Sequence, residues 1–76
     1  MPRLTPIHWG RLVCVFEREG FTVVRQEGSH VVMTKPGSAR PIVIPHYREV
    51  PVFVIRNNLR TGSISRERFF ALLSEC

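Results

Sequence analysis

The sequence predicts an α+β domain in which a three-stranded antiparallel sheet packs against helices. Apolar residues recur at helical spacing in two segments, residues 6–19 and 51–61. Between these segments, two runs rich in β-branched residues flank Gly28 and Ser29, a pair typical of a two-residue hairpin turn. A further short apolar run follows at residues 41–45. Helix, hairpin, strand and helix in this order are typical of a sheet with its helices on one face.

The first helix is expected to run from about residue 6 to about residue 19. Thr5 is a favourable N-cap, and Pro6 suits the first helical position, where a missing N–H has no helical partner to lose. Gly20 supplies a left-handed residue at the end of the helix. His8 is expected on the surface of the first turn. The apolar face of this helix consists of Trp9, Leu12, Val13 and Phe16.

Gly28 and Ser29, which join the two central strands, have the Gly-X form of a type II′ turn. With that turn, Glu27 and His30 become directly opposed neighbours on the two strands. Arg25 lies two residues before Glu27, so Arg25, Glu27 and His30 project from the same face of the sheet. Alternation alone does not show whether this face meets the helices. The other expected pairs are Gln26 with Val31 and Arg25 with Val32.

Three further elements complete the order. Residues 41–45, PIVIP, are expected to form an edge strand, because the proline at each end cannot donate to a ladder. After a short loop, a second helix should begin at residue 51 and end at Gly62, and Ser65 should cap a helix over residues 66–74. This α-β-β-β-α order, with a short extra C-terminal helix, is like that of double-stranded-RNA-binding domains. Such domains bind the phosphates and 2′-hydroxyls of RNA.

The charge of the chain favours a polyanionic partner. With 76 residues, it is long enough for one domain over residues 1–76. Its 11 Lys and Arg oppose 6 Asp and Glu, a formal net charge of +5, and every cation except Lys35 is an arginine. Because a guanidinium binds phosphate through two parallel hydrogen bonds, nucleic acid is the favoured partner. An ordinary basic surface, or an arginine bias in the codon usage of the host, is the alternative explanation.

Neither a membrane nor a metal ion is expected from the sequence. No apolar run approaches the roughly 20 residues that cross a bilayer, and no signal peptide is expected. Cys14 and Cys76 have no neighbouring Cys or His that would complete a zinc site, so no cofactor is predicted. Cys14 is expected to be a small core residue and Cys76 a free thiol. A reducing cytoplasm fits these expectations best.

The run GFTVVRQEGSHVVM, followed by PIVIPHYREV, resembles the HicA (YcfA-like) toxins of bacterial toxin–antitoxin pairs. In that family, a "GF…VRQ.GSH" hairpin precedes a "V.VP.H" strand end and a helix with a Leu-Arg-x-x-Leu pattern that closes in Ile-Ser. Here residues 55–59, IRNNL, correspond to the Leu-Arg-x-x-Leu pattern, and residues 64–65 are the Ile-Ser pair. The resemblance covers residues 7–73. Where the family often opens this helix with Gly-Thr, the chain has Val52, Phe53 and Val54.

The resemblance implies a small, metal-independent endoribonuclease that cuts messenger RNA. It also implies a fold like that of double-stranded-RNA-binding domains, with the histidine of the GSH motif, His30, as the catalytic residue. A HicB-like antitoxin is the implied partner, and it usually binds the toxin and occludes this histidine.

The residues near His30 fit such chemistry. RNA supplies its own nucleophile, the 2′-hydroxyl, and a histidine side chain can donate or accept a proton near neutral pH. Cations from the strands and turns could bind the phosphate. The expected RNA contacts are Arg25, Lys35, Arg40, Ser29 and Gly28, and the candidates for a second acid or base are His46 and Tyr47.

Two other functions remain open at this point. The same basic face would suit a non-catalytic RNA-binding module in which His30 is an ordinary polar strand residue. It would also suit a protein-interaction domain that meets an acidic, antitoxin-like partner. Trp9 is expected in the core, although a half-exposed indole could stack on a base.

Overall fold

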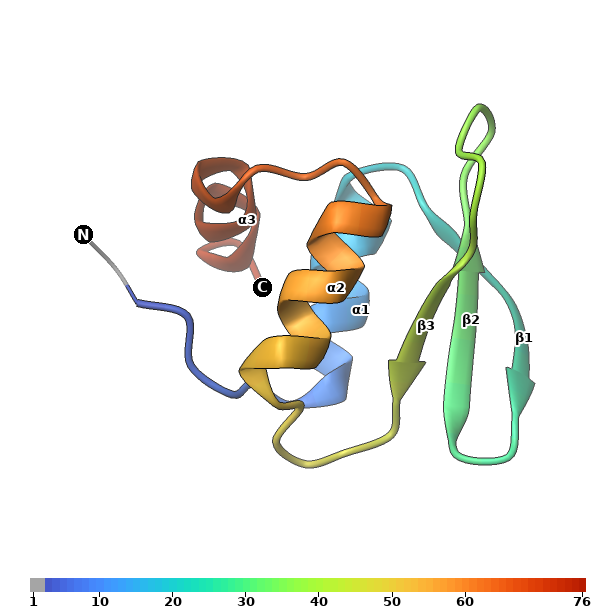
Figure 1. Cartoon of the computed structure of the whole chain (residues 1–76), viewed down its shortest axis with the longest axis horizontal. Helices are drawn as coiled ribbons and strands as arrows, with labels where there is room; N and C mark the ends of the chain where they lie inside the picture. The colour runs from blue at the N-terminus through green and yellow to red at the C-terminus, as the bar shows by residue number, and fades with distance from the viewer. Residues whose placement is uncertain (1–2) are drawn as a thin grey trace.

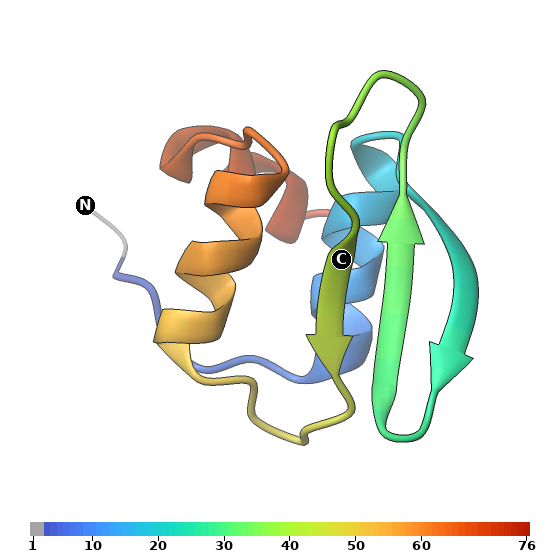
Figure 2. The same ribbon diagram turned by 45° about the vertical axis from the view of Figure 1, so that its right-hand side comes forward.

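The computed structural model describes residues 3–76 and confirms the predicted α+β class and element order (Figure 1). Three antiparallel strands form one sheet in the order β1-β2-β3. The helices lie beside and behind β3, and β1 is the strand farthest from them (Figure 2). No helix in this part of the chain is both long and apolar enough to cross a bilayer. The elements are α1 (Trp9–Arg18), β1 (Thr22–Glu27), β2 (His30–Thr34), β3 (Ile42–Pro45), α2 (Val52–Thr61) and α3 (Arg66–Leu73).

The hydrophobic core lies between the helices and one face of β2 and β3. Val31 and Met33 alternate along β2 and pair with Ile44 and Ile42 of β3, and all four side chains are buried. All six residues of β1, by contrast, are exposed. The helices contribute Leu12, Val15, Phe16, Ile55, Leu59, Phe69 and Leu72 to the same core cluster.

The hairpin has the predicted turn and register. Gly28 has a φ of 58° and Ser29 does not have a positive φ, which is the pattern of a type II′ turn. Glu27 pairs with His30 as predicted, and a bulge between Val23 and Arg25 shifts the register farther along β1. The predicted pairs Gln26–Val31 and Arg25–Val32 are also confirmed.

The register settles which face of the sheet is free. Since Val31 packs in the core, the preceding residue, His30, projects from the opposite face. Directly paired residues share a face, so Glu27 and Arg25 lie on the same side as His30. We call this side the open face; its exposed residues are Arg25, Glu27, His30 and Val43, and between them lie Val32 and Pro45, which are buried.

The first helix begins later than predicted. Ile7 forms an isolated antiparallel bridge with Val50, whose N–H donates to the carbonyl of Ile7 at 2.7 Å. This pairing keeps the chain extended through His8, which has a ψ of 142°. Nδ1 of His8 accepts a hydrogen bond from the N–H of Gly10 at 3.0 Å. His8 is therefore the N-cap of α1, and the prediction of Thr5 is wrong.

The junction between α2 and α3 was predicted correctly except for one residue. α2 ends at Thr61 with Gly62 as its C-cap, but the left-handed residue is Ser63, with a φ of 57°. A Cβ added to Gly62 would lie 2.9 Å from Cε1 of the buried Phe16, so the glycine allows α2 to approach α1 closely. Oγ of Ser65 accepts a hydrogen bond from the N–H of Arg68 at 3.1 Å, which confirms the predicted cap of α3.

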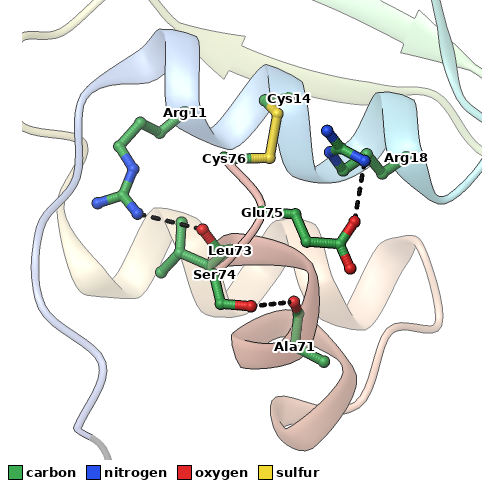
Figure 3. The surroundings of a disulfide bond; sticks show 8 residues. All are labelled: Arg11, Cys14, Arg18, Ala71, Leu73, Ser74, Glu75 and Cys76. Atoms are coloured by element: carbon green, nitrogen blue, oxygen red, sulfur yellow. Dashed lines mark hydrogen bonds and ion pairs between the residues drawn. A yellow bond between two sulfur atoms is a disulfide. The ribbon is translucent and has the colours of Figure 1, made fainter.

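The two cysteines form a disulfide, so the expectation of a free thiol at Cys76 is wrong. Cys14, expected to be a small core residue, is half-buried and is the other half of this bond. α3 packs along α1, and the end of the chain returns to the middle of that helix (Figure 3). The two Cα atoms come within 6.0 Å. Two side chains of α1 hold the same end of the chain: Arg18 forms an ion pair with Glu75 at 2.9 Å, and Arg11 donates to the carbonyl of Leu73 at 3.2 Å.

Candidate functional site

His30 is the first residue of β2 and directly follows the hairpin turn. Its side chain is exposed on the open face. Glu27 is its paired residue on β1 and Pro45 its paired residue on β3, so the backbone of His30 is held between two strands. The imidazole therefore projects from a backbone that is held on both sides, and it is open to solvent. A side chain that transfers a proton to or from an extended substrate needs both properties.

Arg25 lies on the open face diagonally across from His30, because it pairs with Val32 while Glu27 pairs with His30. Its Nε forms an ion pair with Oε2 of Glu27 at 2.9 Å. Both side chains are more than half exposed, 58% for Arg25 and 64% for Glu27, so water screens the pair. Such surface pairs contribute only about 0–1 kcal/mol. A phosphate group, which accepts two hydrogen bonds from one guanidinium, can compete with the carboxylate for Arg25.

His46, a predicted candidate for the second acid or base, lies next to the hairpin turn, but its ring is not presented to a substrate in the way expected of such a group. Its backbone N–H donates to the carbonyl of Ser29 at 2.7 Å, next to His30. The half-buried ring stacks on Trp9, with the ring centroids 3.9 Å apart. Its Nε2 is buried and has no hydrogen-bond partner within residues 3–76. That nitrogen is closed to a substrate, so the visible role of His46 is to fix the turn.

Tyr47 lies in the same loop and has the more accessible side chain, which is 48% exposed. Its N–H donates to the carbonyl of Pro45 at 2.8 Å, and its own carbonyl accepts a hydrogen bond from the N–H of Trp9 at 3.1 Å. The loop after β3 is thus joined both to the hairpin turn and to the beginning of α1. Of the two residues predicted as a second acid or base, Tyr47 is the one with an open side chain.

Lys35 and Arg40 lie at the other end of the sheet. Lys35 follows β2, five positions after His30, which separates the two residues by roughly 17 Å along an extended strand. Its Nζ lies 5.3 Å from the ring centroid of Phe21, beside a cavity of about 380 Å³ between the β2–β3 loop and the end of α2. Arg40 is exposed in the same loop. The structure does not bring these two cations together with His30.

A family model described as HicA toxin of bacterial toxin-antitoxin matches residues 9–62. The chain belongs to the HicA toxin family. No curated protein matches it. The match confirms the family resemblance predicted from the sequence, and it implies an antitoxin as the counterpart of this chain.

The HicA match begins at Trp9, contains the whole sheet and the loop after β3, and ends at Gly62. It therefore includes His30, Arg25 and the stacked pair of Trp9 and His46. α3 lies outside the match, so the disulfide of this HicA toxin joins a residue inside the matched segment to one outside it.

Within residues 3–76 of this HicA toxin, no three His, Cys, Asp or Glu side chains are grouped so that they could hold a metal ion. The groups that surround His30 are instead a carboxylate, a guanidinium and the backbone of a tight turn. They can transfer a proton and bind an anion.

Sequence reasoning missed the part that Trp9 plays in this site. Its spacing placed it on the apolar face of a helix, but it is only half-buried and its indole supports the ring of His46. The contact exists because the loop after β3 crosses the beginning of α1 (Figures 1 and 2). No local pattern in the sequence shows that crossing.

Proposed function

We propose that this HicA toxin is an endoribonuclease that cleaves messenger RNA without a metal ion, with His30 as the proton-transfer group. The observation that carries the proposal is an exposed imidazole held at a tight turn with Arg25 beside it on the same face. The family match supports the toxin role, and the net charge of +5 supports a polyanionic substrate.

The reaction uses the nucleophile that RNA itself carries. As the 2′-oxygen forms a bond to phosphorus, its proton passes to a base. The bond from phosphorus to the 5′-oxygen breaks, and that oxygen receives a proton from an acid. The products are a 2′,3′-cyclic phosphate and a 5′-hydroxyl, so atoms and charge balance without a metal ion. One positioned acid or base typically contributes about 10²- to 10⁴-fold to such a reaction.

The residues take separate roles in this proposal. His30 transfers one of the two protons, and Arg25 binds the phosphate and stabilises the charge that develops on it. Gly28 and Ser29 provide the backbone that the phosphate meets, and Tyr47 is the candidate for the second proton transfer. Lys35 and Arg40, at the far end of the sheet, contact RNA away from the cleaved bond.

A HicB-like antitoxin is proposed to inhibit the enzyme by covering the open face. Besides His30, this face carries Val43, which is 43% exposed and would offer an apolar contact. Adding the antitoxin should therefore stop RNA cleavage and protect His30 from a reagent that modifies imidazoles. Modification of His30 at an unchanged rate in the complex would contradict this mode of inhibition.

The deciding experiment is cleavage of a defined RNA by purified protein, followed on a gel, with chelator present. His30→Ala should abolish cleavage while circular dichroism and thermal unfolding stay unchanged, because the side chain is exposed. His8→Asn is the matched control. It removes another exposed imidazole and keeps an oxygen acceptor that can cap α1, so cleavage should continue.

Two outcomes would replace the proposal. Undiminished cleavage by His30→Ala would reject the role of this histidine. RNA that binds with steep salt dependence but stays intact with the unsubstituted protein would identify a non-catalytic RNA-binding module.

A further inference from the structure

The exposed side of α2 carries an aromatic side chain between arginines. Phe53, in the first turn of α2, is 66% exposed. Arg56 and Arg60 follow at three and seven positions and are both exposed, so the three residues lie along one side of the helix. The opposite side of α2 faces the core through Ile55 and Leu59. We call Phe53, Arg56 and Arg60 the α2 platform.

The arginines of the α2 platform form no ion pair within the described part of the chain. The three ion pairs found within residues 3–76 engage Arg18, Arg25 and Arg68, whereas Arg56 and Arg60 take part in none. α2 itself, VFVIRNNLRT, contains no acidic residue. The platform is therefore a positively charged surface with a large aromatic ring on it.

The beginning of α2, which carries Phe53, lies at the same end of the molecule as the hairpin turn, and Arg60 lies towards the opposite end (Figure 1). The loop of residues 46–51 begins at the end of β3, beside the hairpin, and leads away from it to the beginning of α2 (Figures 1 and 2). The hydrogen bond from His46 to Ser29 fixes this loop to the turn. Tyr47 and Arg48 are exposed along the loop, so a polar and aromatic path runs from the hairpin towards Phe53.

An exposed aromatic ring flanked by guanidinium groups suits single-stranded nucleic acid, since bases stack on the ring and phosphates pair with the cations. We propose that the α2 platform binds single-stranded RNA, with a base stacked on Phe53 and phosphates on Arg56 and Arg60. This inference rests on the proposed function and extends it, because it gives the substrate a second contact beyond the cleaved bond. A protein partner is less favoured, since one phenyl ring among arginines offers little of the apolar area at the centre of protein interfaces.

Binding is measured apart from cleavage, with a fluorescently labelled 12-nucleotide polyuridine and protein that carries His30→Ala. Adding Phe53→Ala should weaken binding about tenfold, whereas Phe53→Trp should preserve it. Arg56→Gln with Arg60→Gln should also weaken binding and should reduce the slope of log affinity against log salt by about 1.4. Arg18→Gln is the control for charge, since Arg18 lies on α1 and pairs with Glu75.

The outcomes separate the two proposals. Affinity that depends on Phe53 while the unsubstituted protein leaves RNA intact supports the platform and rejects the nuclease. RNA cleavage with no effect of Phe53→Ala on affinity rejects the platform and leaves the nuclease standing. A Phe53→Ala variant that binds RNA normally but no longer binds the antitoxin also overturns the proposal, because the platform would then be a protein interface.

Discussion

The imidazole of His46 lies stacked on the indole of Trp9, with ring centroids 3.9 Å apart and ring planes inclined by 27°. This contact joins two parts of the chain that are far apart in the sequence. Through the hydrogen bond from His46 to Ser29, it also connects the beginning of α1 to the turn that holds His30. The candidate catalytic residue thus has an exposed side chain on a backbone that depends on tertiary contacts.

Trp9→Ala should loosen this end of the molecule. Because Trp9 is half-buried, we expect a loss of about 2 kcal/mol in the free energy of unfolding, below the range for fully buried tryptophans. Displacement of the turn should lower RNA cleavage by about 10²-fold even where the protein is fully folded. Urea titration and cleavage kinetics measure the two effects. Trp9→Phe keeps a ring for stacking and should restore most of both; equal damage from both variants would argue against the stack.

His46→Phe separates a structural role of His46 from proton transfer. Phenylalanine retains a ring for the stack on Trp9 and removes the buried Nε2 that lacks a hydrogen-bond partner within residues 3–76. Since an unsatisfied buried polar atom costs about 1–3 kcal/mol, the variant should be at least as stable as the original chain. Cleavage should remain within a few-fold of normal, because the backbone hydrogen bond to Ser29 is kept. A loss as large as that of His30→Ala would assign His46 to the chemistry.

The disulfide should contribute strongly to stability and little to RNA cleavage. Closing a loop between residues 62 positions apart is worth about 4 kcal/mol on the chain-entropy estimate. Cys76→Ser, or reduction with dithiothreitol, should lower the free energy of unfolding by up to that amount. RNA cleavage at a temperature where both forms are folded should be unchanged, since the bond lies between α1 and the C-terminus (Figure 3). The Cys14→Ser, Cys76→Ser double variant is the control and should not respond to dithiothreitol.

Gly62→Ala tests the close approach of α2 to α1. The new methyl group would lie 2.9 Å from Cε1 of Phe16, an aromatic ring that is fully buried. Overpacking of this kind costs about 1–3 kcal/mol, which thermal or urea unfolding would detect. Gly62 has a φ of −85°, so backbone strain would not explain the loss. Ser63→Gly, at a φ of 57°, is the contrasting change and should not destabilise; equal losses from the two variants would point to the loop rather than to Phe16.

Local chemistry explains the parts of the fold that the sequence predicted well. A Gly-X turn sets hairpin register by itself, so the pairing of Glu27 with His30 followed from Gly28 and Ser29 alone. The cap of α3 by Ser65 was equally local. The position of His30 on an accessible face could be derived once the core side of β2 was known.

Long-range contacts explain the parts that were missed. The start of α1 depends on the bridge between Ile7 and Val50, which overrides the local preference of Thr5 for a cap. The disulfide depends on how α3 folds back along α1. Lys35 was grouped with His30 because it comes from the strands and turns of the same sheet, but the extended strand β2 separates the two residues.

Glu27→Gln tests whether the carboxylate beside His30 restrains RNA binding. The substitution removes a negative charge from the open face and releases Arg25 from its ion pair. RNA affinity of the His30→Ala protein should rise about twofold to fivefold at low salt, and the gain should shrink as salt increases. Stability should change by less than about 1 kcal/mol, because the pair is exposed. Glu17→Gln makes the same change of charge on α1, away from the open face, and should leave affinity nearly unaltered. If both substitutions raise affinity equally, net charge is responsible and Arg25 has no special part in binding the phosphate.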